Sequence, residues 1–77
     1  ETLTYARLLN EKARVFMNKN FLPQAEVVFD SAIHLIRRLP GYYKNKDKAN
    51  SYLYRSQLAE KQQLYNEAVS WCNIALQ

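Results

Sequence analysis

The 77-residue chain contains few of the residues that interrupt helices, with one glycine and two prolines. Folds rich in β-turns need many such residues, so their scarcity favours helices joined by short turns. Apolar residues make up 48% of the sequence, and a chain of this length forms one small domain. We therefore predict a single all-α domain spanning residues 1–77.

The sequence also lacks the features that would predict a disulfide or a membrane span. Cys72 is the single cysteine, which excludes an internal disulfide, and its apolar surroundings in the sequence predict a small core residue. No apolar run approaches the roughly 18 residues of a membrane span, and no signal-peptide pattern is present. We expect no membrane partner and an intracellular, cytoplasmic location. Because the sequence ends in mid-pattern, we interpret it as a segment of a longer protein.

Motifs of catalysis and metal binding are absent as well. The sequence has no CxxC, HExxH or phosphate-loop pattern. Its one histidine, His34, has neither a nucleophile nor a metal ligand at motif spacing. We expect no enzyme activity, no cofactor and no metal.

What the chain does contain is an internal repeat of small residues. Separations of twelve and then seven residues link Ala13, Ala25 and Ala32 in the first half, and Ser56, Ala68 and Ala75 in the second. Small side chains at these places let two antiparallel helices approach closely. The repeat therefore predicts two helical hairpins, offset by 43 residues (68 − 25).

Apolar periodicity and turn residues set the expected boundaries. The first hairpin is predicted over about 3–39, with Asn20 capping its second helix, and the second hairpin over about 48–77. Between them, Pro40 and Gly41 followed by Lys44 and Lys46 predict an exposed basic connector over about 40–47.

The two hairpins resemble tetratricopeptide repeats, through the residues that fill the aromatic and small-residue places of that family. In the second hairpin these are Tyr52, Ser56, Ala59, Tyr65, Ala68, Cys72 and Ala75; in the first they are Leu9, Ala13, Phe16, Leu22, Ala25, Phe29 and Ala32. The resemblance implies hairpins stacked as a right-handed superhelix. The prolonged second helix and the connector are similar to those of immunophilin-type co-chaperones.

Two departures from the family pattern affect the expected packing. Lys12 and Arg55 stand where the family usually has a large apolar residue, so we expect their helices to pack less tightly. The segment Tyr52-Leu53-Tyr54-Arg55 also resembles the YL-x-R segment of the microtubule-interacting-and-trafficking bundle, which is the alternative fold.

The tetratricopeptide resemblance further implies that the first helix of each hairpin lines a groove for a partner protein. The groove residues expected to bind a peptide or helix are Arg7, Asn10, Arg14, Asn50, Tyr54, Gln57 and Lys61. With a net charge of +4, an acidic partner is favoured. The carboxylate clamp of co-chaperones is matched poorly, because Asn10, Arg14 and Tyr54 replace its Lys and Asn residues. The function expected is protein–protein interaction, in a co-chaperone or an assembly scaffold.

Two other functions remain open at this point. Two repeats fall short of the three that a stable stack needs, so the final helix can self-associate as a homodimer. The residues expected at that interface are Leu64, Trp71, Ile74 and Leu76. The connector can instead bind nucleic acid through its cations and tyrosines. The residues involved would be Arg37, Arg38, Tyr42, Tyr43, Lys44, Lys46 and Lys48. Basic residues are ordinary at a helix end and in a loop, which makes nucleic acid the weaker alternative.

Overall fold

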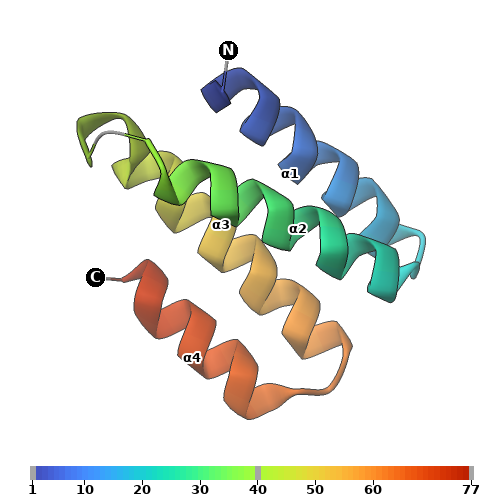
Figure 1. Ribbon diagram of the computed structural model, residues 1–77. Helices are drawn as coiled ribbons and strands as arrows, with labels where there is room; N and C mark the ends of the chain where they lie inside the picture. Colours follow the sequence, from blue (N-terminus) through green and yellow to red (C-terminus); the bar gives the residue numbers. More distant parts are fainter. Residues whose placement is uncertain (1, 40, 77) are drawn as a thin grey trace.

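The protein folds into two helical hairpins. A computed structural model describes the backbone of residues 2–39 and 41–76, with side chains over 2–39 and 46–76. These residues form four helices and no strand: α1 (Thr2–Asn18), α2 (Leu22–Arg37), α3 (Gly41–Lys61) and α4 (Tyr65–Ala75). Helices α1 and α2 form one antiparallel hairpin, and α3 and α4 form the other (Figure 1). The all-α prediction is confirmed.

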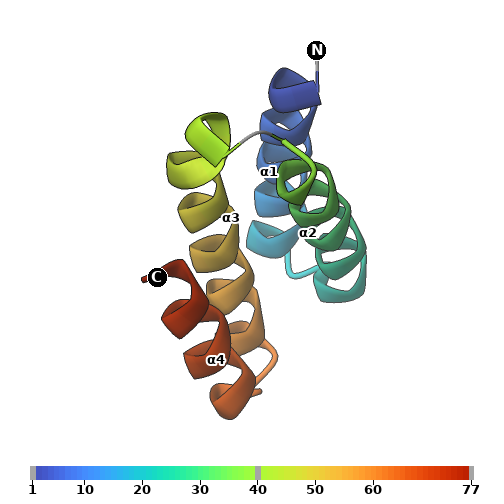
Figure 2. The same cartoon turned by 60° about the vertical axis from the view of Figure 1, so that its left-hand side comes forward.

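The helices pack in the order of the chain. Helix α1 packs on α2, α2 on α3 and α3 on α4, with a smaller contact between α1 and α3. Figure 1 shows α1 and α4 at opposite sides of the molecule, and Figure 2 shows α3 and α4 together on one side and the α1–α2 hairpin on the other. Among the described helices, α4 therefore has a neighbour on one side only.

The turns within the two hairpins have the same hydrogen bonds, offset by 43 residues. The Phe21 N–H donates to the Phe16 carbonyl at 2.8 Å, and the Leu64 N–H donates to the Ala59 carbonyl at the same distance. Three further backbone bonds of the first turn recur at the same offset in the second. The repeat seen in the small residues is therefore also a repeat of backbone geometry.

Both turns pass through a residue in the left-handed region. Asn20 has φ 65° and Gln63, its counterpart in the second turn, has φ 64°. The expected capping role of Asn20 is wrong, because the residue that precedes α2 is Phe21, which makes no side-chain cap. Asparagine suits this place because it tolerates positive φ better than most residues.

The loop predicted over 40–47 is wrong from Gly41 onward, since α3 begins there. Within this longer helix, contacts with α1 hold Asp47 and Ser51: Asp47 accepts a hydrogen bond from Arg7 at 2.7 Å, and Ser51 accepts one from Asn10 at 2.8 Å. These bonds depend on residues forty positions away and leave no periodic apolar signal in the sequence.

The hydrophobic core lies where α3 covers the first hairpin. Ala13 and Ala25 have no exposed surface, and with Met17, Phe29 and Leu58 they form one buried cluster. The close approach predicted for the first hairpin is therefore confirmed.

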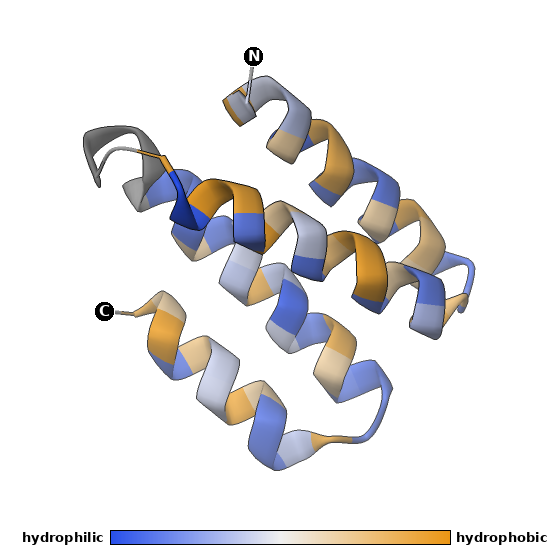
Figure 3. Cartoon of the chain, in the orientation of Figure 1, coloured by the Kyte–Doolittle hydropathy of each residue, from blue (hydrophilic) through white to orange (hydrophobic). Residues whose placement is uncertain are grey.

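In the second hairpin, Ala13 and Ala25 correspond to Ser56 and Ala68, which are only partly buried. Ser56 and Ala68 still meet, because the Ser56 hydroxyl donates to the Ala68 carbonyl at 2.9 Å. Cys72, expected in the core, is half-buried, and no residue of α4 is buried. Figure 3 shows apolar residues along α4 nonetheless.

The looser packing expected at Arg55 is wrong. Its side chain is only 5% exposed. Its Nε donates to Asp30 of α2 at 3.1 Å, and its Nη2 donates to Glu67 of α4 at 3.2 Å. The guanidinium also lies 5.4 Å from the ring centroid of Trp71. Arg55 thus links three helices and replaces the expected apolar side chain.

Lys12, 43 residues earlier, has no such partners within its own hairpin. It is exposed, and its Nζ lies 5.9 Å from the ring centroid of Phe16.

None of the described helices is long and apolar enough to cross a membrane.

Candidate functional site: the groove between α1 and α3

A hollow of about 400 Å³ opens between α1 and the N-terminal half of α3. We call it the α1–α3 groove, and its lining residues are Arg7, Asn10, Glu11, Lys46, Asp47, Asn50 and Tyr54. Both helices contribute polar side chains, so the hollow is suited to hydrogen bonding rather than to an entirely apolar ligand.

Two of the lining residues, Arg7 and Asp47, form an ion pair. Arg7 binds Asp47 through two hydrogen bonds, from Nε at 2.7 Å and from Nη2 at 3.1 Å. The Asp47 side chain is nearly buried, whereas Arg7 is largely exposed. The hydrogen bond from Arg7 lowers the pKa of Asp47 below its ordinary value, against an opposing effect of burial. Asp47 is therefore ionised at neutral pH and holds Arg7 in place.

The floor of the groove contains a buried amide. Asn10 donates from Nδ2 to the Ser51 hydroxyl at 2.8 Å, which fixes its orientation. Its Oδ1 is buried and has no hydrogen-bond partner among the described residues. An unpaired buried acceptor is costly, and it is satisfied when a donor such as a water or a ligand N–H reaches it.

One lining residue, Tyr54, is aromatic and has partners on its ring. The Tyr54 ring stacks on Phe29 of the core, with 6.2 Å between centroids and 29° between planes. The Arg14 guanidinium lies 4.8 Å from the Tyr54 centroid and binds Glu11 at 3.0 Å. Tyr54 is thus held between the core and Arg14, so it presents a fixed surface to the groove.

The structure brings together most of the residues predicted to bind a partner. Arg7, Asn10, Asn50 and Tyr54 line one hollow, and Arg14 adjoins it through Tyr54. Two others are not part of it: Gln57 and Lys61 are exposed positions that do not line the hollow.

Three lining residues were missed. Lys46 and Asp47 fell in the predicted loop, and Glu11 was not assigned to the groove. A signal was available, because Asp47, Asn50 and Tyr54 are spaced by three and four residues and share one helical face.

Both arginines among the predicted groove residues already have carboxylate partners. Arg7 pairs with Asp47, and Arg14 pairs with Glu11. An acidic segment would have to compete with these two carboxylates, which weakens the charge argument for such a partner.

The residues predicted for self-association have different surroundings. Leu64 and Leu76 are exposed, whereas Trp71 and Ile74 are half-buried. Trp71 stacks on Tyr52 of α3, with 5.5 Å between ring centroids. Its place in the structure is explained by contacts within the chain.

Two of the basic residues predicted to bind nucleic acid have other contacts within the chain. Arg37 donates to the Tyr52 hydroxyl at 2.9 Å, while Lys46 lines the groove. Tyr42, Tyr43 and Lys44 lie outside the residues whose side chains are described.

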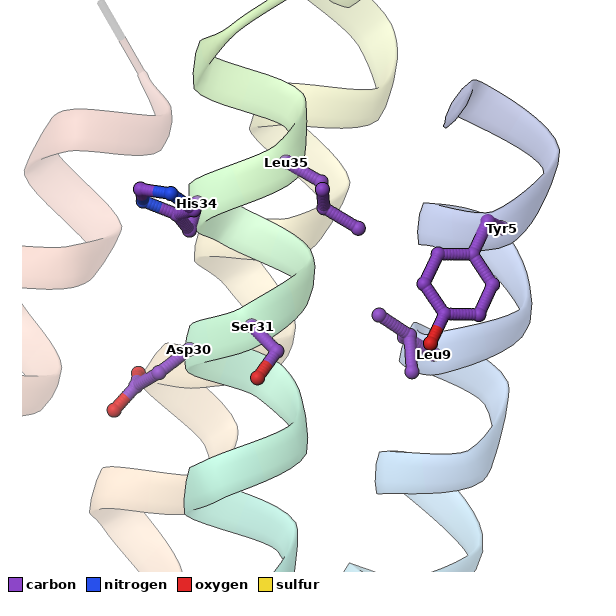
Figure 4. A pocket seen from close by; sticks show the side chains of 6 residues that line it. All are labelled: Tyr5, Leu9, Asp30, Ser31, His34 and Leu35. Atoms are coloured by element: carbon purple, nitrogen blue, oxygen red, sulfur yellow. The ribbon is translucent and has the colours of Figure 1, made fainter. Parts of the chain in front are cut away.

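A second hollow lies between α1 and α2. Figure 4 shows Ser31 and Leu35 pointing toward α1, where Tyr5 and Leu9 lie, while His34 points to the other side of α2. Asp30 also lines this hollow, but it is paired with Arg55.

In the described part of the chain, no group of three or more His, Cys, Asp or Glu side chains is arranged to hold a metal ion.

Comparison of the chain with known protein families, with curated proteins and with solved structures found no match. No relative therefore identifies a tetratricopeptide family for this chain, and that resemblance stays a prediction.

Proposed function

We propose that the chain is a protein–protein interaction module whose α1–α3 groove binds an extended segment or a helix of a partner protein. The observation that carries this proposal is the hollow itself, where Asn10, Asn50 and Tyr54 meet from two helices. The tetratricopeptide resemblance supports it, because the first helices of that family's hairpins line such a groove. The role suits an assembly scaffold or a co-chaperone in the cytoplasm.

The walls of the groove define the chemistry of the bound segment. The unpaired Oδ1 of Asn10 calls for a hydrogen-bond donor, such as a backbone N–H. The Tyr54 ring lies between Phe29 and Arg14, so a bound segment meets the edge of the ring and not its faces. Because Glu11 and Asp47 also line the groove, a polar segment with hydrogen-bond donors fits better than a run of carboxylates.

Selection from a displayed library of random peptides tests the proposal, with isotope-labelled chain used to map the binding site by NMR. We expect bound peptides to shift the resonances of Asn10, Asn50 and Tyr54 most. Arg14→Glu and Asn50→Glu should weaken binding by about tenfold each, a loss equivalent to about 1.4 kcal/mol.

Lys19→Glu is the matched control, since Lys19 is an exposed residue of the α1–α2 turn and the charge change equals that of Arg14→Glu. It should leave affinity within about twofold. If selected peptides shift resonances elsewhere, or if the control weakens binding as much as Asn50→Glu, the groove is not the binding site.

A further inference from the structure

Helix α4 exposes an apolar stripe. Tyr65, Val69, Cys72 and Leu76 are spaced by four, three and four residues, so they share one face. Val69 is 59% exposed and Leu76 is 78% exposed. We call these four residues the α4 outer face.

Helix α1, at the opposite side of the row of helices, exposes a second stripe. Tyr5, Leu8 and Val15 are 57%, 63% and 51% exposed, and Lys12 completes the same side of the helix. We call these four residues the α1 outer face. The two ends of the molecule thus expose apolar side chains on different helices.

The 43-residue repeat shows what covers equivalent residues inside the chain. Val69 and Cys72 correspond to Glu26 and Phe29 of α2. Those two residues contact α3, through the hydrogen bond from Gln62 to Glu26 and the stacking of Phe29 on Tyr54. The α4 outer face is therefore the counterpart of a face that α3 covers.

The same correspondence holds for the other end. Lys12 and Val15 of α1 correspond to Arg55 and Leu58 of α3. Arg55 binds Asp30 of α2, and Leu58 is buried in the cluster that contains Phe29. The α1 outer face is thus the counterpart of the side of α3 that packs on α2.

From this correspondence we propose that the chain associates head to tail, with the α1 outer face of one copy docked on the α4 outer face of another. The contact between copies repeats the contact between α2 and α3 within each copy. Because the two faces are different surfaces, the association does not close after two copies, and each dimer keeps one free face at either end.

The chemistry of this contact is apolar burial rather than ion pairing. Within the chain, Arg55 has the carboxylates of Glu26 and Asp30. The residues at the corresponding positions of α4 are Val69 and Asn73, so Lys12 of a second copy meets no carboxylate and no cation there. Association through this contact is therefore weaker than the packing of α3 on α2 and is concentration-dependent.

Sedimentation velocity on the 77-residue chain, from about 10 µM to about 1 mM, tests the proposal. The unmodified chain should form dimers and then larger oligomers as its concentration rises. Val15→Lys and Val69→Lys should each be monomeric, with helix content by circular dichroism unchanged because both side chains are exposed.

A mixture of the two variants is the decisive sample. Each retains the face that the other lacks, so an equimolar mixture should give a dimer that grows no further. The single substitution Asn73→Asp, which places a carboxylate opposite Lys12 as Asp30 stands opposite Arg55, should tighten association about fivefold relative to the unmodified chain.

Three results would overturn the proposal. One is an unmodified chain that stays monomeric at the highest concentration. Another is a Val15→Lys chain that still dimerises, which would show that two α4 faces meet each other. The third is a mixture that remains monomeric.

Discussion

The two hairpins have the same backbone design and different surroundings. Their turns share hydrogen bonds and a left-handed residue at matching places, Asn20 and Gln63. Yet α2 buries Phe29, Ala32 and Ile33 among others, and α4 buries no residue. The difference shows that the sequence repeat sets the shape of each hairpin, while burial depends on which helix lies next to it.

The side chains of Arg55 and Lys12 show the same dependence on the neighbouring helix. They occupy equivalent positions of the repeat, but Arg55 lies between two helices and Lys12 lies at the edge of the molecule. Arginine is suited to the covered position because its planar guanidinium donates several hydrogen bonds and stacks on an aromatic ring. One of its donors, Nη1, is nevertheless buried without a partner among the described residues.

Replacing Arg55 is expected to have the largest effect on stability, and the largest difference from the equivalent change in the first hairpin. Arg55→Ala removes the hydrogen bonds to Asp30 and Glu67 together with the packing on Trp71, and should lower the free energy of unfolding by about 3 kcal/mol. Urea denaturation, monitored by circular dichroism, measures this change in free energy.

Lys12→Ala, at the equivalent exposed position, should change the free energy of unfolding by less than about 0.5 kcal/mol. Equal losses in the two variants would show that position in the repeat, and not the neighbouring helix, determines the contribution.

Enlarging a small residue should have the next largest effect. Ala25→Leu inserts a bulky side chain where no surface is exposed, and overpacking should cost about 2 kcal/mol. Ala68→Leu, at the half-buried equivalent, should cost about 1 kcal/mol because α4 can shift outward. Melting temperatures of the two variants check the order, and an unchanged melting temperature in both would disprove the close approach of the helices.

The smallest expected effect concerns acid sensitivity, and it tests the ion pair of Arg7 and Asp47, which joins the first helices of the two hairpins. Because the hydrogen bond from Arg7 lowers the pKa of Asp47 in the folded chain, the unfolded chain binds a proton first as pH falls. The stabilisation by Asp47 is therefore complete above about pH 4 and is lost as pH falls through the lower, folded pKa.

Asp47→Asn should lower the free energy of unfolding by about 1 kcal/mol at pH 7, with a difference that shrinks below about pH 4. Denaturation at a series of pH values measures this difference. A gap between the two proteins that stays constant down to pH 2 would mean that Asp47 contributes through packing alone.

Helices and turns of the fold could be predicted because their signals are local. The spacing of Ala13 and Ala25 predicted the first hairpin, and α2 ends at Arg37, two residues before the expected end of that hairpin. The start of α3 could not be predicted, because Gly41 follows a proline and the next residues have no apolar stripe. Further along α3, Asp47 pairs with Arg7, a residue forty positions away.

The part of the candidate site that could be predicted is the part that depends on which residues share a helical face. Asn10 and Tyr54 lie on the expected sides of α1 and α3 and meet in one hollow. The pairing of Arg7 and Arg14 with carboxylates was not predictable, since it depends on the distance between the helices and on side-chain orientation as well as on spacing.

The sequence by itself determined that this protein is all-α, that its helices pair as hairpins, and that the second hairpin repeats the first. Those features follow from contacts between residues close in the chain, which periodicity and turn residues specify. Only the tertiary structure decided that Arg55 is a buried link, that α3 extends back to Gly41, and which apolar stripes stay exposed. Each of these depends on which helix lies alongside, and the free energy of such contacts is set by neighbours distant in sequence.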